Sequence, residues 1–324
     1  MKKIVQFLFF CLCVTCASIL FLQESVQAIA KVENTQPVIA EKENGRITRI
    51  LVLGCDRSAH LADAIMIVTV CEGSAETSVL QLPRDTYAEY TTRDYKKLNG
   101  ILQEKGELGT LRFLSDAIGI PLDYFVILDL DCVASIVDAV GGVDLEIPQE
   151  MLYSDPVQGL KIDLHAGANH LNGSQAEQFI RYRSGYLNAD LGRLDAQKLF
   201  LRAFVQKCAS LTASEKLRIV LSTLLGLQTN LDLPAAIRMT KLFGNCQADT
   251  IPMETLAGQA VQGRSGAWYY SINRAGALRM FNEFLMPPHP LDEESFDPNG
   301  VFDRLDHPDF HNIYIAPESH LPLG

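Results

Sequence analysis

Apolar positions in the middle of the chain form short continuous runs, typical of buried strands, separated by stretches with helical spacing. The runs predict strands at Ile50–Gly54, Ala64–Val70, Ser78–Leu82, Asp123–Leu130, Val143–Ile147 and Ala267–Ile272. Helices are predicted at Leu98–Lys105, Gly109–Ile118, Asp131–Val140, Asn172–Arg183, Ser214–Leu225, Pro234–Phe243 and Asn273–Leu285, with a long one from Asp190. We therefore expect an α/β fold: a single three-layer α/β/α domain with a mixed central sheet.

The N-terminus has the pattern of a membrane-targeting segment. Met1-Lys-Lys3 precedes an apolar run from Ile4 to Leu22 that approaches the ~20 residues needed to cross a bilayer. Positive charge before such a run places the following chain outside the membrane. We expect residues 1–23 to be a signal-anchor that holds an extracellular main domain. Cleavage near Ser25-Val-Gln-Ala28 is the alternative.

The remaining boundaries follow from changes in composition. Residues 24–46 are polar and lack a period, as expected of a linker, and the strands and helices fill residues 47–286. Residues 287–324 are rich in Pro and Asp and predict a solvated tail. A calcium loop in this tail is disfavoured, because carboxylates do not occupy the required positions.

The long helix changes character along one face. Positions 190, 193, 197, 201, 204 and 208 have i, i+3, i+7 spacing and carry Asp, Arg, Gln, Leu, Phe and Cys. A face that is polar and then apolar suits a helix that begins at a pocket and continues into the core. We expect Asp190 to cap this helix, and Arg181, Arg183 and Arg193 to bind phosphate oxygens. The alternative is a cluster of surface ion pairs around the cap.

Polar residues also recur where the first strands begin or end. Asp56 and Arg57 follow the first strand, Asp63 opens the second, and Arg84 and Asp85 follow the third. Lys97 and Asn99 come shortly afterwards. Ligands of open α/β sheets bind at strand ends, so one pocket is expected to gather most of these side chains with the arginines of the helix region.

Two carboxylates among arginines indicate Mg²⁺ with a polyphosphate. Mg²⁺ prefers hard oxygen ligands and takes one or two protein carboxylates together with water and phosphate oxygens. Asp56 and Asp63 are the expected ligands. The competing interpretation is that these two residues only terminate strands.

The chain resembles a known family, the LytR-CpsA-Psr (LCP) proteins. The resemblance runs from about Ile47 to Lys207, and the order and spacing of its motifs make it specific. The motifs are Leu53-Gly-Cys-Asp56, Asp63, Leu82-Pro-Arg-Asp-Thr86, Lys97-Leu-Asn99, Val140-Gly-Gly-Val143, Asn172 to Arg183, and Asp190 to Gln197.

The resemblance implies a membrane-anchored phosphotransferase of Gram-positive cell-wall assembly. Such a protein moves a glycopolymer from a polyprenyl-pyrophosphate carrier in the membrane lipid onto peptidoglycan. It implies that Asp56 and Asp63 hold the metal and that pyrophosphate is bound by Arg84, Arg181, Arg183 and Arg193, with Gln197 matching the family's glutamine. It also implies a hydrophobic cavity for the lipid, for which Leu201 and Phe204 are candidates, with ordinary core packing as the alternative.

The sequence departs from the family pattern at two positions. Leu61 occurs where the family usually has an arginine, and Ala196 replaces a basic residue before Gln197. Both departures remove positive charge, which Arg57 could partly restore. Arg57, Lys97 and Asn99 are therefore counted with the residues expected to bind substrate.

The implied reaction is phosphoryl transfer to a sugar hydroxyl of peptidoglycan, with Asp85 or Asp190 as the base that accepts the hydroxyl proton. Two other functions stay open. The first is a hydrolase that cleaves the pyrophosphate lipid with water. The second is a non-catalytic polyprenyl-phosphate-binding envelope regulator.

Composition agrees with this class. The formal net charge is −11, which disfavours nucleic acid as a partner and requires the positive charge of an anion site to be local. The five cysteines after the apolar segment are odd in number, so they predict no complete disulfide framework and are expected to be small core residues. Cys55 is the exception, because it directly precedes Asp56 at the expected site.

Overall fold

The structure is a computed structural model. It describes residues 45–55, 60–72, 74, 76–90, 96–156, 159–186, 189–212, 214–215, 219, 228–232, 234–235, 250–263, 266–297 and 299–302, without the side chains of residues 189 and 190. The expected signal-anchor and nearly all of the expected linker lie outside these residues. In the described part, no helix is both long and apolar enough to span a bilayer.

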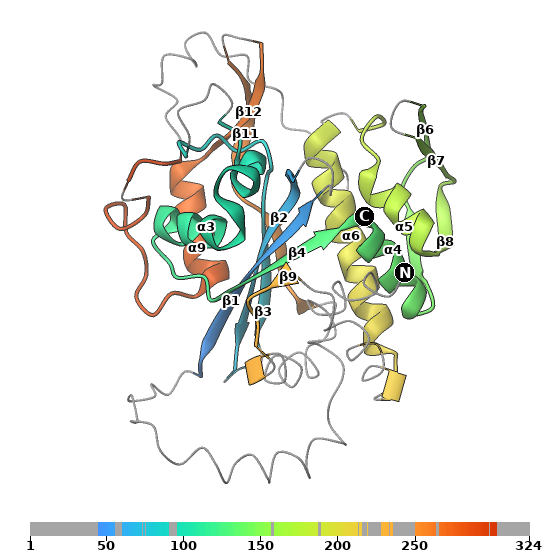
Figure 1. Cartoon of the computed structure of the whole chain (residues 1–324), viewed down its shortest axis with the longest axis horizontal. Helices are drawn as coiled ribbons and strands as arrows, with labels where there is room; N and C mark the ends of the chain where they lie inside the picture. Colours follow the sequence, from blue (N-terminus) through green and yellow to red (C-terminus); the bar gives the residue numbers. More distant parts are fainter. Residues whose placement is uncertain are drawn as a thin grey trace.

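A six-stranded mixed sheet forms the centre of the molecule (Figure 1), in the order β10-β3-β2-β1-β4-β9. Its strands are β1 (Ile47–Cys55), β2 (Ala62–Cys71), β3 (Thr77–Leu82), β4 (Tyr124–Asp129), β9 (Gln228–Thr229) and β10 (Met253–Thr255). β1 is antiparallel to β2 and parallel to β4, and β2 is antiparallel to β3. The carboxyl ends of β1, β3 and β4 and the amino end of β2 therefore share one edge.

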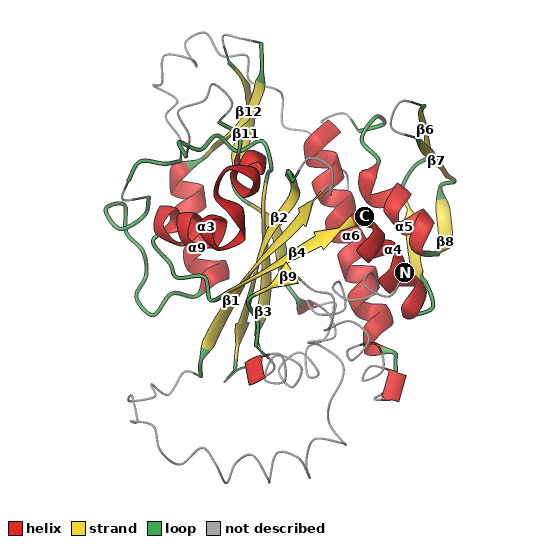
Figure 2. Cartoon of the chain, in the orientation of Figure 1, coloured by secondary structure: helices red, strands yellow, loops and turns green. Residues whose placement is uncertain are grey.

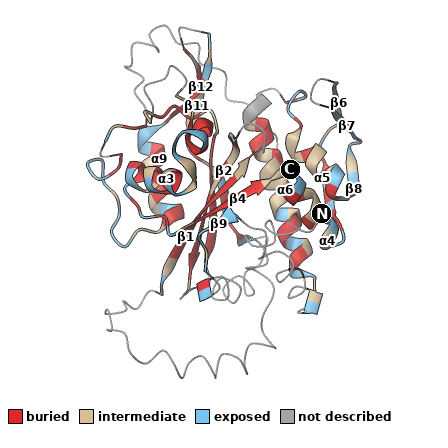
Figure 3. Cartoon of the chain, viewed as in Figure 1, coloured by how far each residue is buried: buried red, intermediate tan, exposed pale blue. Residues whose placement is uncertain are grey.

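Helices cover both faces of the sheet, which confirms the expected three layers (Figure 2). One face carries α3 (Ile101–Ile118) and α9 (Arg274–Leu285), and the other carries α4 (Leu130–Ala139), α5 (Gly173–Arg181) and α6 (Ala189–Ala209). Alternate strand residues enter different cores: Ile50 and Val52 contact the α4–α6 side, whereas Leu51 and Leu53 contact the α3 side. The strands are consequently buried on both faces (Figure 3).

Three two-stranded sheets lie outside the central sheet. β5 (Val143–Ile147) pairs with β8 (Gly167–Leu171), β6 (Met151–Asp155) with β7 (Leu160–Leu164), and β11 (Gly258–Gln262) with β12 (Trp268–Ile272). The sequence pattern predicted β5 and β12 only. The other four strands are short and mostly polar on their outer face, so they carry little apolar signal.

Several helix boundaries differ from the prediction. Residues 98–100 form one 3₁₀ turn that leads directly into α3, in which Gly106 is non-helical at φ 66° and ψ −175°. α4 begins at Leu130, one residue before the predicted start, and its cap is Asp129, whose carboxylate accepts a hydrogen bond from the Cys132 amide at 2.9 Å. The helices expected at Ser214–Leu225 and Pro234–Phe243 fall mostly outside the described residues.

The prediction of a solvated tail is wrong for the first part of residues 287–324. Phe296 and Phe302 are 0% and 1% exposed and belong to the core on the α3 side. Asp297 holds this segment, because its buried carboxylate accepts hydrogen bonds from the amides of Val301 (2.6 Å) and Phe302 (3.0 Å) and forms an ion pair with Arg274. The phenylalanines of this segment indicated burial, but the high Pro and Asp content of the tail favoured the opposite interpretation.

Replacing Asp297 by alanine is expected to destabilise the protein by about 3 kcal/mol, because two buried amides lose their acceptor. Urea unfolding followed by circular dichroism measures this change. Glu293→Ala, at an exposed position of the same segment, is the matched control and should stay within about 0.5 kcal/mol of the parent. Equal stabilities for the two variants would contradict the anchoring role of Asp297.

Candidate functional site

A cavity of about 590 Å³ lies at the sheet edge where β1, β3 and β4 end and β2 begins. Its wall combines residues from the sheet, from α4, α5 and α6, and from the β6–β7 hairpin. These residues are Gly54, Cys55, Asp63, Ala64, Met66, Arg84, Leu128, Asp129, Leu130, Val133, Tyr153, Leu160, Ile180, Arg181, Arg183, Ser184, Arg193, Gln197, Phe200 and Leu201. One predicted metal ligand, all four predicted phosphate-binding arginines and Gln197 thus meet in one place.

Asp63 and two arginines form the polar core of this cavity. Arg84 Nη1 donates to the carboxylate of Asp63 across the gap between β3 and β2. Arg193 reaches the same residue from α6, with Nη2 3.3 Å from the Asp63 carbonyl oxygen. Arg193 is only 5% exposed. A guanidinium with so little access to water is stabilised by anionic partners, which here include any phosphate that enters the cavity.

Arg181 and Arg183 reach the cavity because α5 ends between them. Arg181 is the last residue of α5, and Tyr182 is extended at φ −61° and ψ 136°. The Tyr182 side chain is buried and packs edge-to-face on Tyr186, with the ring centroids 5.5 Å apart. Both arginines therefore line the cavity while the residue between them enters the core. Arg181 also pairs with Glu177 one turn earlier, at 2.9 Å.

Three residues of the predicted face of α6 share one cavity, as expected. Arg193, Gln197 and Leu201 all line the cavity. The buried Oε1 of Gln197 has no hydrogen-bond partner among the described residues, which suits an atom that accepts a hydrogen bond from a ligand or its water. Gly192 allows the start of this helix to approach Tyr186, because a Cβ at Gly192 would lie 2.5 Å from the Tyr186 Cβ.

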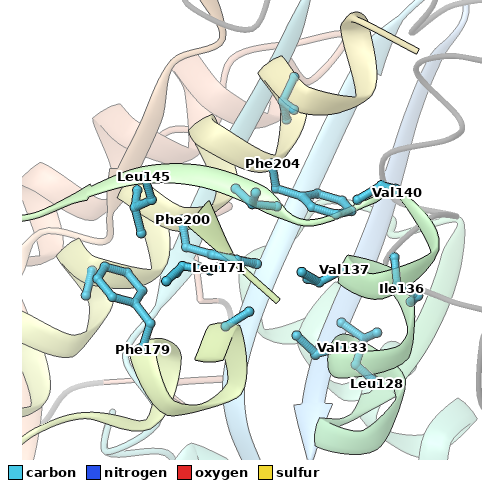
Figure 4. Packing of buried hydrophobic residues seen from close by; sticks show 14 of the residues in the cluster. Leu128, Val133, Ile136, Val137, Val140, Leu145, Leu171, Phe179, Phe200 and Phe204 are labelled. Carbon is cyan, nitrogen blue, oxygen red and sulfur yellow. The ribbon is translucent and has the colours of Figure 1, made fainter. Parts of the chain in front are cut away.

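Most of the remaining wall is apolar, with Asp129 and Ser184 as polar exceptions. Met66, Leu128, Val133, Leu160, Ile180, Phe200 and Leu201 line it from several different elements. Figure 4 shows Phe200 projecting from α6 toward the cluster that includes Leu171 and Val137. A cavity with arginines at one end and aliphatic and aromatic side chains over the remainder fits an amphipathic anion, such as a phosphate ester with a hydrocarbon chain.

Four predicted residues do not line the cavity. Asp85 forms an ion pair with Lys97 at 2.9 Å, and the Lys97 ammonium lies over the Tyr269 ring. Asn99 is buried and its backbone amide donates to the carbonyl of Arg84, so it supports the backbone beside the site. Phe204 is fully buried and stacks on Phe200 (Figure 4), so ordinary core packing is the correct interpretation for it.

Three predicted residues lie wholly or partly outside the described part of the chain. Asp56 and Arg57 fall outside it entirely, and so does the side chain of Asp190. The backbone corrects one point, since α6 already includes Ala189 and Asp190 is therefore inside the helix and not its cap. Ala196 is 2% exposed within the core, so an arginine there would have to displace packed apolar side chains.

Sequence reasoning missed several cavity residues. The prediction that Asp129 belongs to a strand is confirmed, but its place in the cavity wall was not predicted: Asp129 is the last residue of β4 and pairs with Cys55. Tyr153 and Leu160 belong to a hairpin that was not predicted. Phe200 lies one position before Leu201, so it was not among the positions of α6 that the i, i+3, i+7 spacing selected. The acidic residue directly after an apolar run was the signal that could have found Asp129.

The cysteines behave as expected where they are described. Cys71, Cys132 and Cys208 are buried, Cys55 is half-buried in the cavity wall, and no disulfide joins these four described cysteines. Cys246 lies outside the described residues.

The chain is thus a mixed α/β protein with an arginine-lined cavity at one edge of its central sheet. The model of the LytR_cpsA_psr family matches residues 17–284. The chain belongs to this family. The match ends before the buried segment around Phe296 and Asp297.

Two curated Bacillus proteins illustrate the relationship. The polyisoprenyl-teichoic acid–peptidoglycan teichoic acid transferase TagU of Bacillus mycoides is 26% identical over 259 residues, which cover 78% of this chain and 80% of the relative. The similarly named TagV of Bacillus subtilis is 25% identical over 215 residues, or 64% of this chain and 55% of TagV. This chain thus spans little more than half the length of TagV.

The fold agrees with solved structures. The crystal structure of B. subtilis TagV superimposes with a TM-score of 0.64 at 22% identity, over 77% of this chain and all of the TagV chain. That similarity supports the mixed sheet with helices on both faces.

Arg183→Ala is expected to weaken the binding of inorganic pyrophosphate by about tenfold or more, because it removes a charge-assisted hydrogen-bond donor from the cavity wall. Isothermal titration calorimetry of the full-length protein measures this change. Arg202→Ala, an exposed arginine of α6 that does not line the cavity, is the control for lost net charge. Equal affinities in the two variants would show that the cavity does not bind the anion.

Proposed function

We propose that this protein is a membrane-anchored phosphotransferase that moves a glycopolymer phosphate from a polyprenyl-pyrophosphate carrier to a sugar hydroxyl of peptidoglycan. The observation that carries the proposal is the composition of one cavity, where four arginines and Asp63 adjoin an apolar wall. The relatives named as teichoic acid transferases support the same reaction type. The apolar run of residues 4–22 supports the membrane anchor and an extracellular domain.

In the proposed reaction, the acceptor hydroxyl oxygen attacks the phosphorus on the glycan side of the pyrophosphate. A new P–O bond forms, the bridging P–O bond breaks, and polyprenyl phosphate leaves with the bond electrons. Arg84, Arg181, Arg183 and Arg193 bind the phosphate oxygens and stabilise the charge that develops on them. The apolar wall holds the first part of the lipid and positions the pyrophosphate against the arginines.

The hydroxyl proton must pass to a base. Of the two carboxylates expected in this role, Asp85 is paired with Lys97 and does not line the cavity. Asp190, at the start of α6, therefore becomes the preferred candidate for general base.

The residues present fit a magnesium ion. Among the described residues, no group of three or more His, Cys, Asp or Glu side chains could form a complete protein cage. Mg²⁺ does not need one, since it uses one or two carboxylates and takes water and phosphate oxygens as further ligands. Asp63, whose side chain is 42% exposed in the cavity, would hold the ion together with Asp56. Bound there, Mg²⁺ would neutralise charge on the pyrophosphate.

The decisive experiment incubates the full-length protein with Mg²⁺, a polyprenyl-pyrophosphate-linked glycan and peptidoglycan fragments, and follows all products by mass spectrometry. We expect the acceptor to gain the glycan phosphate, and Arg183→Ala to lose most of this activity while Arg202→Ala retains it. Released glycan phosphate without an adduct would establish the hydrolase instead. Binding of the lipid without either product would establish a non-catalytic binder, and normal turnover by both Arg84→Ala and Arg183→Ala would exclude the site.

Asp63→Asn is expected to raise the Mg²⁺ concentration for half-maximal transfer by at least about tenfold, because the variant loses an ionised oxygen ligand. The direct measurement is the affinity for Mn²⁺, used as a paramagnetic substitute, by electron paramagnetic resonance. Asp195→Asn is the control, since Asp195 pairs with Lys198 on α6 and does not line the cavity. An unchanged metal affinity in Asp63→Asn would remove this residue from the metal site.

A further inference from the structure

A second, smaller cavity adjoins the first on the opposite face of the sheet. Its volume is about 270 Å³, and it lies between the end of β1, the middle of α3 and the edge strand β9. Cys55 belongs to the walls of both cavities. The alternation of strand side chains explains the arrangement, because Leu128 of β4 lines the first cavity and Ile127 lines the second. The two cavities thus meet at the carboxyl end of β1.

The wall of the second cavity combines apolar surface with four polar side chains, and none of its described residues is an arginine or a lysine. Gln103 and Glu107 lie one turn apart on α3, and His60 and Gln228 join them in the wall from the sheet side. The Gln228 amide donates to the Glu107 carboxylate, which fixes α3 to the edge strand. Amide, carboxylate and imidazole groups beside the apolar side chains of Leu102 and Ile127 match a neutral molecule with many hydroxyl groups better than they match a phosphate.

The break in α3 contributes to this cavity. Gly106 lines it with a positive φ of 66°, and a Cβ at this position would meet no atom within 4 Å. The regular helix is interrupted there, and the Gly106 carbonyl accepts a hydrogen bond from Thr110 Oγ1 at 2.7 Å. A glycine with positive φ at a cavity wall lets a ligand approach the backbone closely, because no side chain intervenes.

We propose that the second cavity binds a pyranose sugar next to the reacting phosphate. The inference rests on the proposed function, in which the lipid side of the pyrophosphate occupies the apolar cavity between the sheet and α6. In an in-line displacement the attacking and leaving oxygens lie on opposite sides of the phosphorus, so the acceptor sugar must approach from the side away from the lipid. The donor sugar is bonded to the same phosphorus through an equatorial oxygen and therefore lies beside the reacting atoms. The cavity on the α3 face lies on that side and has room for one sugar ring.

The sugar belongs either to the acceptor glycan or to the transferred glycopolymer, and the kinetics of two variants separate these sources. Gln103→Ala removes one hydrogen-bonding side chain, and Gln103→Phe fills the cavity from an exposed position of α3. A roughly three- to tenfold rise in the KM for the acceptor identifies the acceptor sugar, and the same rise in the KM for the lipid-linked donor identifies the donor sugar. Glu104→Ala, an exposed neighbour that does not line the cavity, is the matched control.

A binding measurement keeps the test independent of turnover. Saturation-transfer NMR of the full-length protein with chitotetraose, a soluble β-1,4-linked N-acetylglucosamine oligomer, is expected to give saccharide signals that Gln103→Phe abolishes and Glu104→Ala preserves. One result would overturn the sugar subsite and leave the proposed function intact. In that result the parent protein transfers glycan, and all three variants have the same KM values and saccharide signals as the parent. Disappearance of the saccharide signals in Gln103→Phe alone would support the subsite even if the parent transfers no glycan.

Discussion

Burial of the central sheet on both faces is the constraint on which the site depends. Ile50 to Leu53 are at most 1% exposed, so strand interiors have no place for an unpaired charge. Charged side chains can emerge only where strands begin or end, and the antiparallel insertion of β2 brings its first residues to the edge where β1, β3 and β4 finish. Asp63 and Arg84 meet at this edge because of that order, not because they are close in sequence.

The same layers explain why the cavity has two kinds of wall. α6 begins at the charged edge and runs into the core, so its polar and apolar residues follow one another along a single face. Arg193 is buried beside Asp63, Leu201 lies farther along, and Phe204 is fully enclosed. A ligand that satisfies the arginines is held against hydrocarbon at its other end, which combines charge recognition with exclusion of water.

The buried segment around Asp297 has a bearing on the site as well. Glu89 donates its amide to the carbonyl of Val301, and Ala88 pairs with Phe302. These interactions support the chain that runs from Arg84 toward Lys97. Residues beyond the family match therefore help to fix the loop that carries one of the site arginines, through backbone pairing and burial of two aromatic rings.

The sequence by itself determined the local features: the main strands, the α5 and α9 caps at Asn172 and Asn273, and the polar-to-apolar face of α6. Those features depend on interactions between residues that are close in sequence. The order of the family motifs along the chain is also a property of the sequence alone. Only the tertiary structure decided which polar residues share a cavity, because strand order and register connect positions that are distant in sequence. In the structure Asp129 and Phe200 line the cavity, whereas Asp85 and Phe204, which were expected there, do not. A second cavity lies where α3 is interrupted at Gly106.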